Sequence, residues 1–165
     1  MFGQIVRSKG HKEVLETIVK LKEETRLPLK FSLHIKGPSE DNVYLEELKR
    51  FCKNHQLEEV VKIETGFFDK EKVIPLYKKL IVASASEAFG RVIVEANKAG
   101  LKVIVRNSGG APELVNETNG LVYNHPGELA KILAGDMALP GGKVCMNYEE
   151  DREIALLKNW LNELV

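Results

Sequence analysis

Apolar side chains recur along the chain with two alternating periods, one typical of helices and one typical of strands. Residues 11–25 and 42–55 carry apolar residues every three or four positions, which predicts two helices with one buried face each. Extended apolar runs predict strands over 29–37 and 59–66, and a short helix is expected over 70–79. The first half of the chain therefore predicts strands and helices in regular alternation.

The same alternation continues through the second half of the chain. Residues 80–84 and 102–106 are continuous apolar runs, which are typical of parallel strands covered on both faces. They flank a helix that is expected to begin near Gly90. Residues 120–124 predict a final edge strand, and the amphipathic residues 149–165 predict a closing helix.

The chain also opens on an apolar run, MFGQIV, which predicts a first strand directly at Met1. We interpret Met1 as a boundary within a longer chain, because no helix or loop precedes this strand. About six strands alternating with helices predict an α/β fold, a Rossmann-like doubly wound parallel sheet whose ligands bind beyond the carboxyl ends of the strands. A length of 165 residues predicts a single domain over 1–165.

Composition narrows the classes of function. Lys plus Arg and Asp plus Glu each number 24, so the net charge is zero and no overall basic field exists to attract nucleic acid or an anionic membrane. Any anion must therefore be bound locally. The two cysteines lack metal-ligand spacing, and no apolar run reaches the roughly 20 residues that span a bilayer. These features predict a cytoplasmic protein, without excluding a peripheral membrane attachment of a full-length form.

The first candidate site is the turn after the opening strand. Gly3 permits close backbone approach, and the turn of Ser8, Lys9 and Gly10 presents a mobile positive charge. A phosphate group would fit there. A Lys-Gly turn is also a common solvated loop, and the residues match neither a P-loop nor a G-x-G-x-x-G fingerprint, so both interpretations stay open.

The second candidate site is the start of the helix near Gly90. Gly90, Arg91 and Val92 present unpaired backbone amides at this N-terminus, and such amides favour an anion such as a diphosphate. Glu87 precedes the helix, and Glu95 lies about 8 residues further on, about 12 Å along a helix axis. This separation excludes a close catalytic pair and suits hydroxyl groups at the two ends of an extended ligand.

A purely structural alternative exists for both glutamates. Glu87 would cap the helix, and Glu95 would form a surface pair with Arg91 or Lys98, worth only about a few tenths of a kcal/mol. Spacing alone does not decide between the two interpretations.

A longer pattern surrounds these glutamates. Within residues 82–123 a serine precedes Glu87, a Phe-Gly step follows it, and a second glutamate is followed by Gly-Gly, Pro-Glu-Leu-Val and Asn-Gly. Upstream, GQIVRSKG is similar to a Gly-Arg, spacer, Lys-Gly loop. The combination resembles the donor-binding, C-terminal half of the GT-B glycosyltransferases, specifically the large retaining family 4. The resemblance covers most of residues 2–134.

The resemblance implies roles for the matching residues. Glu87 would contact hydroxyls of the donor sugar, Glu95 would hold the ribose, and Lys9 would neutralise phosphate charge as the sugar leaves, which makes Glu87 and Lys9 the candidate catalytic residues. The residues that we expect to bind the donor are Gly3, Gln4, Arg7, Phe89, Gly90, Arg91, Val92, Glu95, Gly109 and Gly110.

Two of these expectations carry an open alternative. The family's usual arginine in the diphosphate site is Gln4 here, and Arg7, three positions on, is a candidate replacement for its charge. The loop that contains Gly109 and Gly110 would lie beside the donor, although such a loop can also be simply a tight turn.

The resemblance therefore predicts the donor-binding domain of a retaining glycosyltransferase, one half of a GT-B fold whose N-terminal acceptor domain is absent. Its ligand would be a nucleotide diphosphate sugar, with a glycan or lipid-linked acceptor of polysaccharide biosynthesis bound through the absent domain. No metal, cofactor or nucleic acid is expected, and the chain alone would not transfer sugar. The alternatives are a nucleotide-sugar-binding module without transferase activity, which Gln4 favours, and half of a sugar-nucleotide 2-epimerase.

Overall fold

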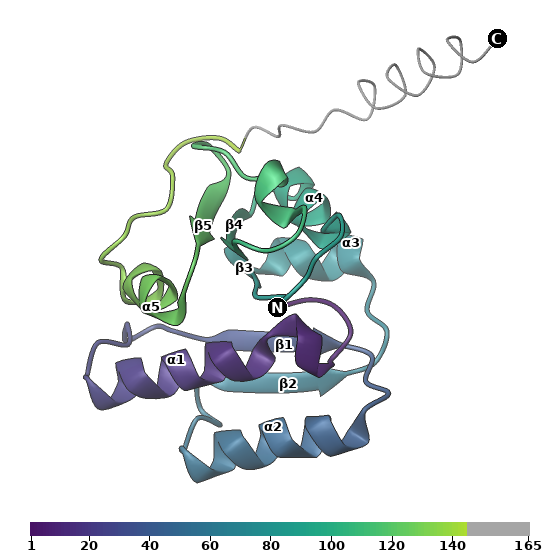
Figure 1. Ribbon diagram of the computed structural model, residues 1–165, viewed down its shortest axis with the longest axis vertical. Helices are drawn as coiled ribbons and strands as arrows, with labels where there is room; N and C mark the ends of the chain where they lie inside the picture. The colour runs from purple at the N-terminus through teal and green to yellow at the C-terminus, as the bar shows by residue number, and fades with distance from the viewer. Residues whose placement is uncertain (145–165) are drawn as a thin grey trace, which may run out of the picture.

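The chain folds into five parallel strands in two sheets, and its structure, a computed structural model, describes residues 1–144 (Figure 1). One sheet pairs β1 with β2, and the other has the order β3-β4-β5. The expected helix over 149–165 lies outside the described residues. The strands are β1 Leu33–Gly37, β2 Val61–Thr65, β3 Lys79–Val82, β4 Lys102–Arg106 and β5 Gly120–Tyr123.

Helices cover both faces of the β3-β4-β5 sheet, with α1 and α5 on one face and α4 on the other, as expected of a Rossmann-like fold. In Figure 1, α1 and α2 lie on one side of β1 and β2, and α4 lies beside the sheet of β3 and β4. The predicted helix over 70–79 is shorter, because a 3₁₀ turn containing a proline replaces its second half. The helices are α1 His11–Glu23, α2 Asn42–Asn54, α3 Lys70–Val73, α4 Arg91–Lys98 and α5 Pro126–Ala134, and the 3₁₀ turns are η1 Arg7–Lys9, η2 Ile74–Leu76 and η3 Ala111–Leu114.

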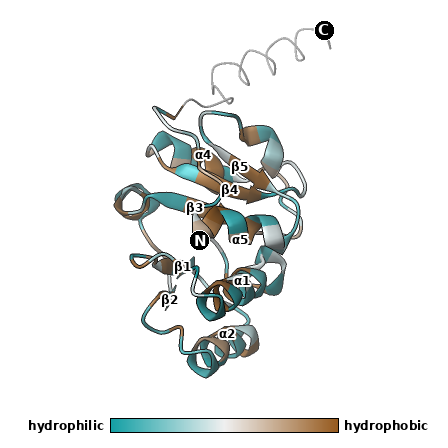
Figure 2. Ribbon diagram, turned by 90° about the vertical axis from the view of Figure 1, so that its left-hand side faces the viewer, coloured by the Kyte–Doolittle hydropathy of each residue, from teal (hydrophilic) through white to brown (hydrophobic). Residues whose placement is uncertain are grey.

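Alternating side chains of β3 and β4 divide the interior into two apolar clusters. Ile81 and Ile104 pack in the cluster that contains the buried faces of α1, α2 and α5. Val82 and Val103 point to the opposite face, where they pack in the cluster that contains Ile93 of α4. Both faces of these strands are therefore apolar, which explains their unbroken apolar sequence (Figure 2).

The prediction of an opening strand is wrong, and residues 1–144 have five strands in two sheets instead of about six strands in one. Phe2 forms only an isolated parallel bridge with Lys36 of β1. Gly3 adopts φ 137°, which interrupts the extended backbone, although its amide still donates to the carbonyl of Lys36. The amide of Ile5, two residues later, donates to the carbonyl of Pro38 beyond the end of β1. The N-terminal segment lies between β1 and β3 without joining the two into one ladder (Figure 1).

Candidate functional site

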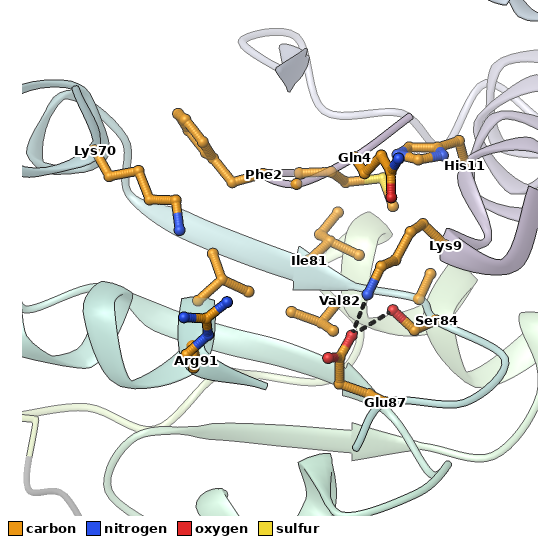
Figure 3. Close-up of a pocket in the computed structure, with 14 residues that line it drawn as sticks. Phe2, Gln4, Lys9, His11, Lys70, Ile81, Val82, Ser84, Glu87 and Arg91 are labelled. Atoms are coloured by element: carbon orange, nitrogen blue, oxygen red, sulfur yellow. Dashed lines mark hydrogen bonds and ion pairs between the residues drawn. The ribbon is translucent and has the colours of Figure 1, made fainter. Parts of the chain in front are cut away.

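A cavity of about 280 Å³ lies at the carboxyl end of β3. The N-terminal segment, the turn η1, the start of α4 and Lys70 of α3 surround it (Figure 3). Three parts of the chain that are distant in the sequence thus meet at one edge of the sheet, which is where ligands bind in doubly wound folds. The predicted site residues in its wall are Gly3, Gln4, Lys9, Glu87, Arg91 and Val92.

A cluster of three polar side chains occupies one end of this cavity. The Nζ atom of Lys9 donates to Oε2 of Glu87 at 2.6 Å, and the hydroxyl of Ser84 donates to the same oxygen at 2.9 Å (Figure 3). The side chains of Lys9 and Glu87 are 33% and 17% exposed, so the ion pair is screened less than one at the surface. The two candidate catalytic residues, one from each sequence motif, are therefore in direct contact.

The turn that carries Lys9 depends on Gly10. This glycine adopts φ 70°, and a Cβ atom at its position would lie 2.0 Å from the carbonyl oxygen of Ala83. The amide of Ala85 donates to the carbonyl of Ser8 at 2.7 Å, which fastens the turn to the end of β3. The Lys-Gly turn is thus a packed element that places Lys9 in the cavity and is not a solvated loop.

Glu87 caps α4 as well as binding Lys9. Burial raises the pKa of Glu87, but hydrogen bonds from Lys9, from Ser84 and from the backbone amide of Gly90 outweigh burial and hold this pKa below its ordinary value. Its carboxylate therefore stays charged at neutral pH and lies against the positive end of the helix. The structure thus places Glu87 beside Gly90, the N-cap residue of α4, as the capping interpretation expects, and leaves its other oxygen near the cavity (Figure 3).

The glycine-rich loop packs against the backbone of Glu87. The amide of Gly110 donates to the carbonyl of Glu87 at 2.8 Å, and a Cβ atom on Gly109 would lie 2.2 Å from that oxygen. Gly109 and Gly110 are outside the cavity wall, so the structure gives them a packing role against the Glu87 backbone. Phe89 is also outside the wall, and its side chain is 41% exposed.

Glu95 lies on α4 beyond the cavity wall and pairs with a residue from another helix. The Nζ atom of Lys70 is 2.9 Å from each carboxylate oxygen of Glu95. Sequence spacing within α4 did not predict this contact between two helices. Lys70 itself belongs to the cavity wall, so the ion pair connects Glu95 to the site.

Arg7 lies away from the cavity. Its guanidinium is 2.6 Å from Glu47 of α2 and lies over the ring of Tyr44 at 4.8 Å from the ring centroid. Gln4 does line the cavity, so the structure does not bring the candidate replacement charge beside it.

Three polar residues of the cavity wall were absent from the predicted set of site residues. They are Ser84, Lys70 and His11, and His11 is only 3% exposed. Burial lowers the pKa of His11 to about 4, aided by the nearby N-terminal ammonium group and by Lys9 and opposed by the carbonyl of Val6. Its Nδ1 atom is buried without a hydrogen-bond partner among the described residues. The position of His11 directly after the Lys-Gly turn was the one feature of the sequence that could have indicated its place in the cavity wall.

The described residues contain no cluster of metal-ligating side chains. None of the helices within residues 1–144 is long and apolar enough to cross a membrane.

Comparison with solved structures finds glycosyltransferases. HepE of Anabaena, crystallised with UDP and glucose, is 27% identical at a TM-score of 0.71, over 81% of this chain and 36% of HepE. A glycosyltransferase of Rickettsia africae is 27% identical at a TM-score of 0.71, over 79% of this chain and 35% of the other. The C-terminal domain of the group 1 glycosyl transferase LpcC of Francisella tularensis is 26% identical at a TM-score of 0.64, over 80% of this chain and 70% of that domain.

This chain thus spans about a third of the length of HepE and of the Rickettsia protein. No curated protein matches it. The family match covers residues 1–135, which include the whole cavity wall and both glutamates. The chain belongs to the group 1 glycosyl transferases.

Proposed function

We propose that the chain is the donor-binding domain of a retaining glycosyltransferase of family 4, which moves a hexose from a nucleotide diphosphate sugar to a glycan or a lipid-linked acceptor. The observation that carries this proposal is the contact of Lys9 with Glu87 at the N-terminus of α4, inside a cavity at the carboxyl end of β3. This arrangement brings a cation, a carboxylate and the amides of a helix N-terminus to one cavity. A sugar diphosphate needs all three kinds of group.

Lys9 and the start of α4 are the groups that would hold the diphosphate. A departing nucleotide diphosphate gains negative charge, and a fixed ammonium beside a helix N-terminus stabilises that charge. Glu87 keeps the ammonium in place in the free chain through their 2.6 Å contact. When a donor binds, phosphate oxygens take over part of that contact, and the Glu87 carboxylate accepts hydrogen bonds from sugar hydroxyls.

Retention of configuration is a proposal that rests on the family resemblance. The leaving phosphate would assist attack on the same face of the sugar, with Lys9 balancing its charge and without a protein nucleophile. The acceptor would be held by a further domain, because the cavity groups described above are all assigned to the donor substrate. The HepE structures that contain UDP, UDP-glucose, or UDP with glucose support a uridine diphosphate hexose as the first donor to test.

A thermal-shift panel tests this function directly. The 165-residue chain is heated with UDP, GDP, ADP and their hexose conjugates. A ligand at about 100 times its dissociation constant adds about 2.7 kcal/mol of stability, which raises the melting temperature by about 5–10 °C in a domain of this size. We expect one nucleotide and its conjugate to produce such a shift.

Two lysine variants show whether the shift comes from this cavity. Lys9→Met should abolish most of the shift, because it removes the cation beside Glu87. Lys12→Met is the matched control, since Lys12 pairs with Glu47 at 2.9 Å and does not line the cavity. The proposal fails if no nucleotide shifts the melting temperature, or if both variants respond alike.

A further inference from the structure

Lys70 extends into the cavity from the side opposite Lys9 (Figure 3). It belongs to α3, which follows β2 in the chain and lies next to α4 (Figure 1). Its Nζ atom is 2.9 Å from both carboxylate oxygens of Glu95. An ammonium group has three N–H donors, and Glu95 supplies two oxygens, so one donor remains for a ligand in the cavity.

The charges around the cavity indicate what the remaining N–H donor of Lys70 would bind. The ammonium groups of Lys9 and Lys70 are matched by the carboxylates of Glu87 and Glu95, and the neighbouring Gln4 carries no charge. Arg7 is held by Glu47 away from the cavity. A nucleoside diphosphate carries at least two negative charges at neutral pH, so Lys9 alone does not balance it. Lys70 and Arg91 are the remaining cations of the described cavity wall.

We propose that Lys70 is a binding residue that makes this site specific for nucleoside phosphates over nucleosides. Lys70 donates a hydrogen bond to the phosphate nearest the nucleoside and holds Glu95 in position for the ribose hydroxyls. It thereby places a second ammonium N–H donor in the cavity, where Gln4 carries no charge. This inference rests on the proposed function, and it adds a residue that neither the motif nor the family resemblance assigns.

The geometry allows Glu95 to bind Lys70 and the ribose at the same time, so the two need not compete for its carboxylate. A carboxylate has about four acceptor sites, so Glu95 can keep the Lys70 contact and still accept from two hydroxyl groups. The side chains of Lys70 and Glu95 are 46% and 36% exposed, which leaves room for a ligand to approach both. The ion pair therefore orients both groups before the ligand arrives.

Calorimetric titration of the 165-residue chain with UDP, UMP and uridine tests the inference. Lys70→Met should weaken UDP and UMP by about tenfold, the loss expected for one charge-assisted hydrogen bond. Uridine should be weakened by a smaller factor, because it loses only the positioning of Glu95. Lys70→Arg keeps the charge and should recover most of the affinity for UDP. Lys72→Met is the control, because Lys72 lies on the same short helix, pairs with Asp69 and is 84% exposed.

The other outcomes refute the inference in distinguishable ways. Equal losses for UDP and uridine in Lys70→Met would show that Lys70 acts only by holding Glu95. Tighter UDP binding by this variant would show that Lys70 competes with the ligand for Glu95. Unaltered UDP binding by the variant would remove Lys70 from the site while leaving the proposed function intact. Failure of the unaltered chain to bind UDP, UMP or uridine overturns the inference, and the proposed function also fails if the thermal panel finds no other nucleotide.

Discussion

Replacing Gly10 with alanine tests whether the Lys9 turn is built by close packing against β3. The new Cβ atom would lie 2.0 Å from the carbonyl oxygen of Ala83, whereas such a contact is ordinarily longer than 3.4 Å. Either the turn or the strand end must therefore move by more than an ångström. The backbone also has φ 70°, a conformation that costs an L-residue about 1–2 kcal/mol.

The expected loss is about 3 kcal/mol of unfolding free energy for Gly10→Ala, the sum of the backbone cost and of a strain of similar size at a packed contact. This corresponds to a fall of about 10 °C in melting temperature for a domain of this size. Gly135→Ala is a matched control, because Gly135 has φ 90° and no atom within 4 Å of the new Cβ. The control should lose only about 1 kcal/mol.

Urea denaturation of both variants measures the difference, and titration with UDP gives a second readout. Displacement of the turn should separate Lys9 from Glu87, so Gly10→Ala should bind UDP more weakly at a temperature where it is still folded. Gly135→Ala should bind as the unaltered chain does. Equal stability losses in the two variants, or normal UDP binding by Gly10→Ala, would refute the argument that packing at Ala83 places Lys9.

Two further predictions concern the glutamates and His11. Glu95→Ala should weaken UDP and a UDP-sugar alike by about tenfold, whereas Glu87→Ala should weaken mainly the UDP-sugar, as calorimetry would show. His11 has a folded pKa of about 4 against an ordinary 6.5, so its neutral form is favoured by folding, and stability is lost as the pH falls from 6.5 towards 4. That loss should be about 3 kcal/mol larger in the unaltered chain than in His11→Gln, measured by urea denaturation across this range.

Each of these has a clear contrary result. Equal losses for both ligands in both glutamate variants would favour the helix-cap and surface-pair interpretation. Parallel pH profiles for the unaltered chain and His11→Gln would show that the buried imidazole is protonated without cost. The N-terminal ammonium, whose pKa burial lowers to about 5, titrates in both chains, so the difference between the profiles isolates His11.

The strands β3 and β4 were predictable because a continuous apolar run, which is a local feature of the sequence, is enough to indicate them. Each has apolar residues on both faces, and apolar clusters cover both faces in the structure. The opening segment has a similar apolar sequence, but strand formation also requires hydrogen bonds to neighbours. Only Phe2 bridges to β1 before Gly3 interrupts the extended backbone. Sequence pattern predicts burial well, whereas ladder pairing depends on contacts between distant segments.

The same distinction separates the site residues that were found from those that were missed. Glu87 and Gly90 are three positions apart, and a cap of this kind is visible in the sequence. Arg7 was wrongly expected in the diphosphate site because it is close to Lys9 in sequence. Residues two apart in a 3₁₀ turn point roughly 120° apart, so Arg7 faces α2 while Lys9 faces the cavity. Lys70 meets Glu95 across 25 positions, a contact that no local pattern encodes.

The contact between Lys9 and Glu87 spans 78 positions and joins two parts of the chain whose sheets share no ladder in residues 1–144. Contiguous parts of a protein can open as separate cooperative units, each with its own rate of amide hydrogen exchange. A ligand that bridges Lys9, Glu87 and Lys70 would oppose separation of the two sheets. Bound nucleotide should therefore slow exchange of the amides in β2, a strand that does not line the cavity, because opening of that unit would then require ligand release.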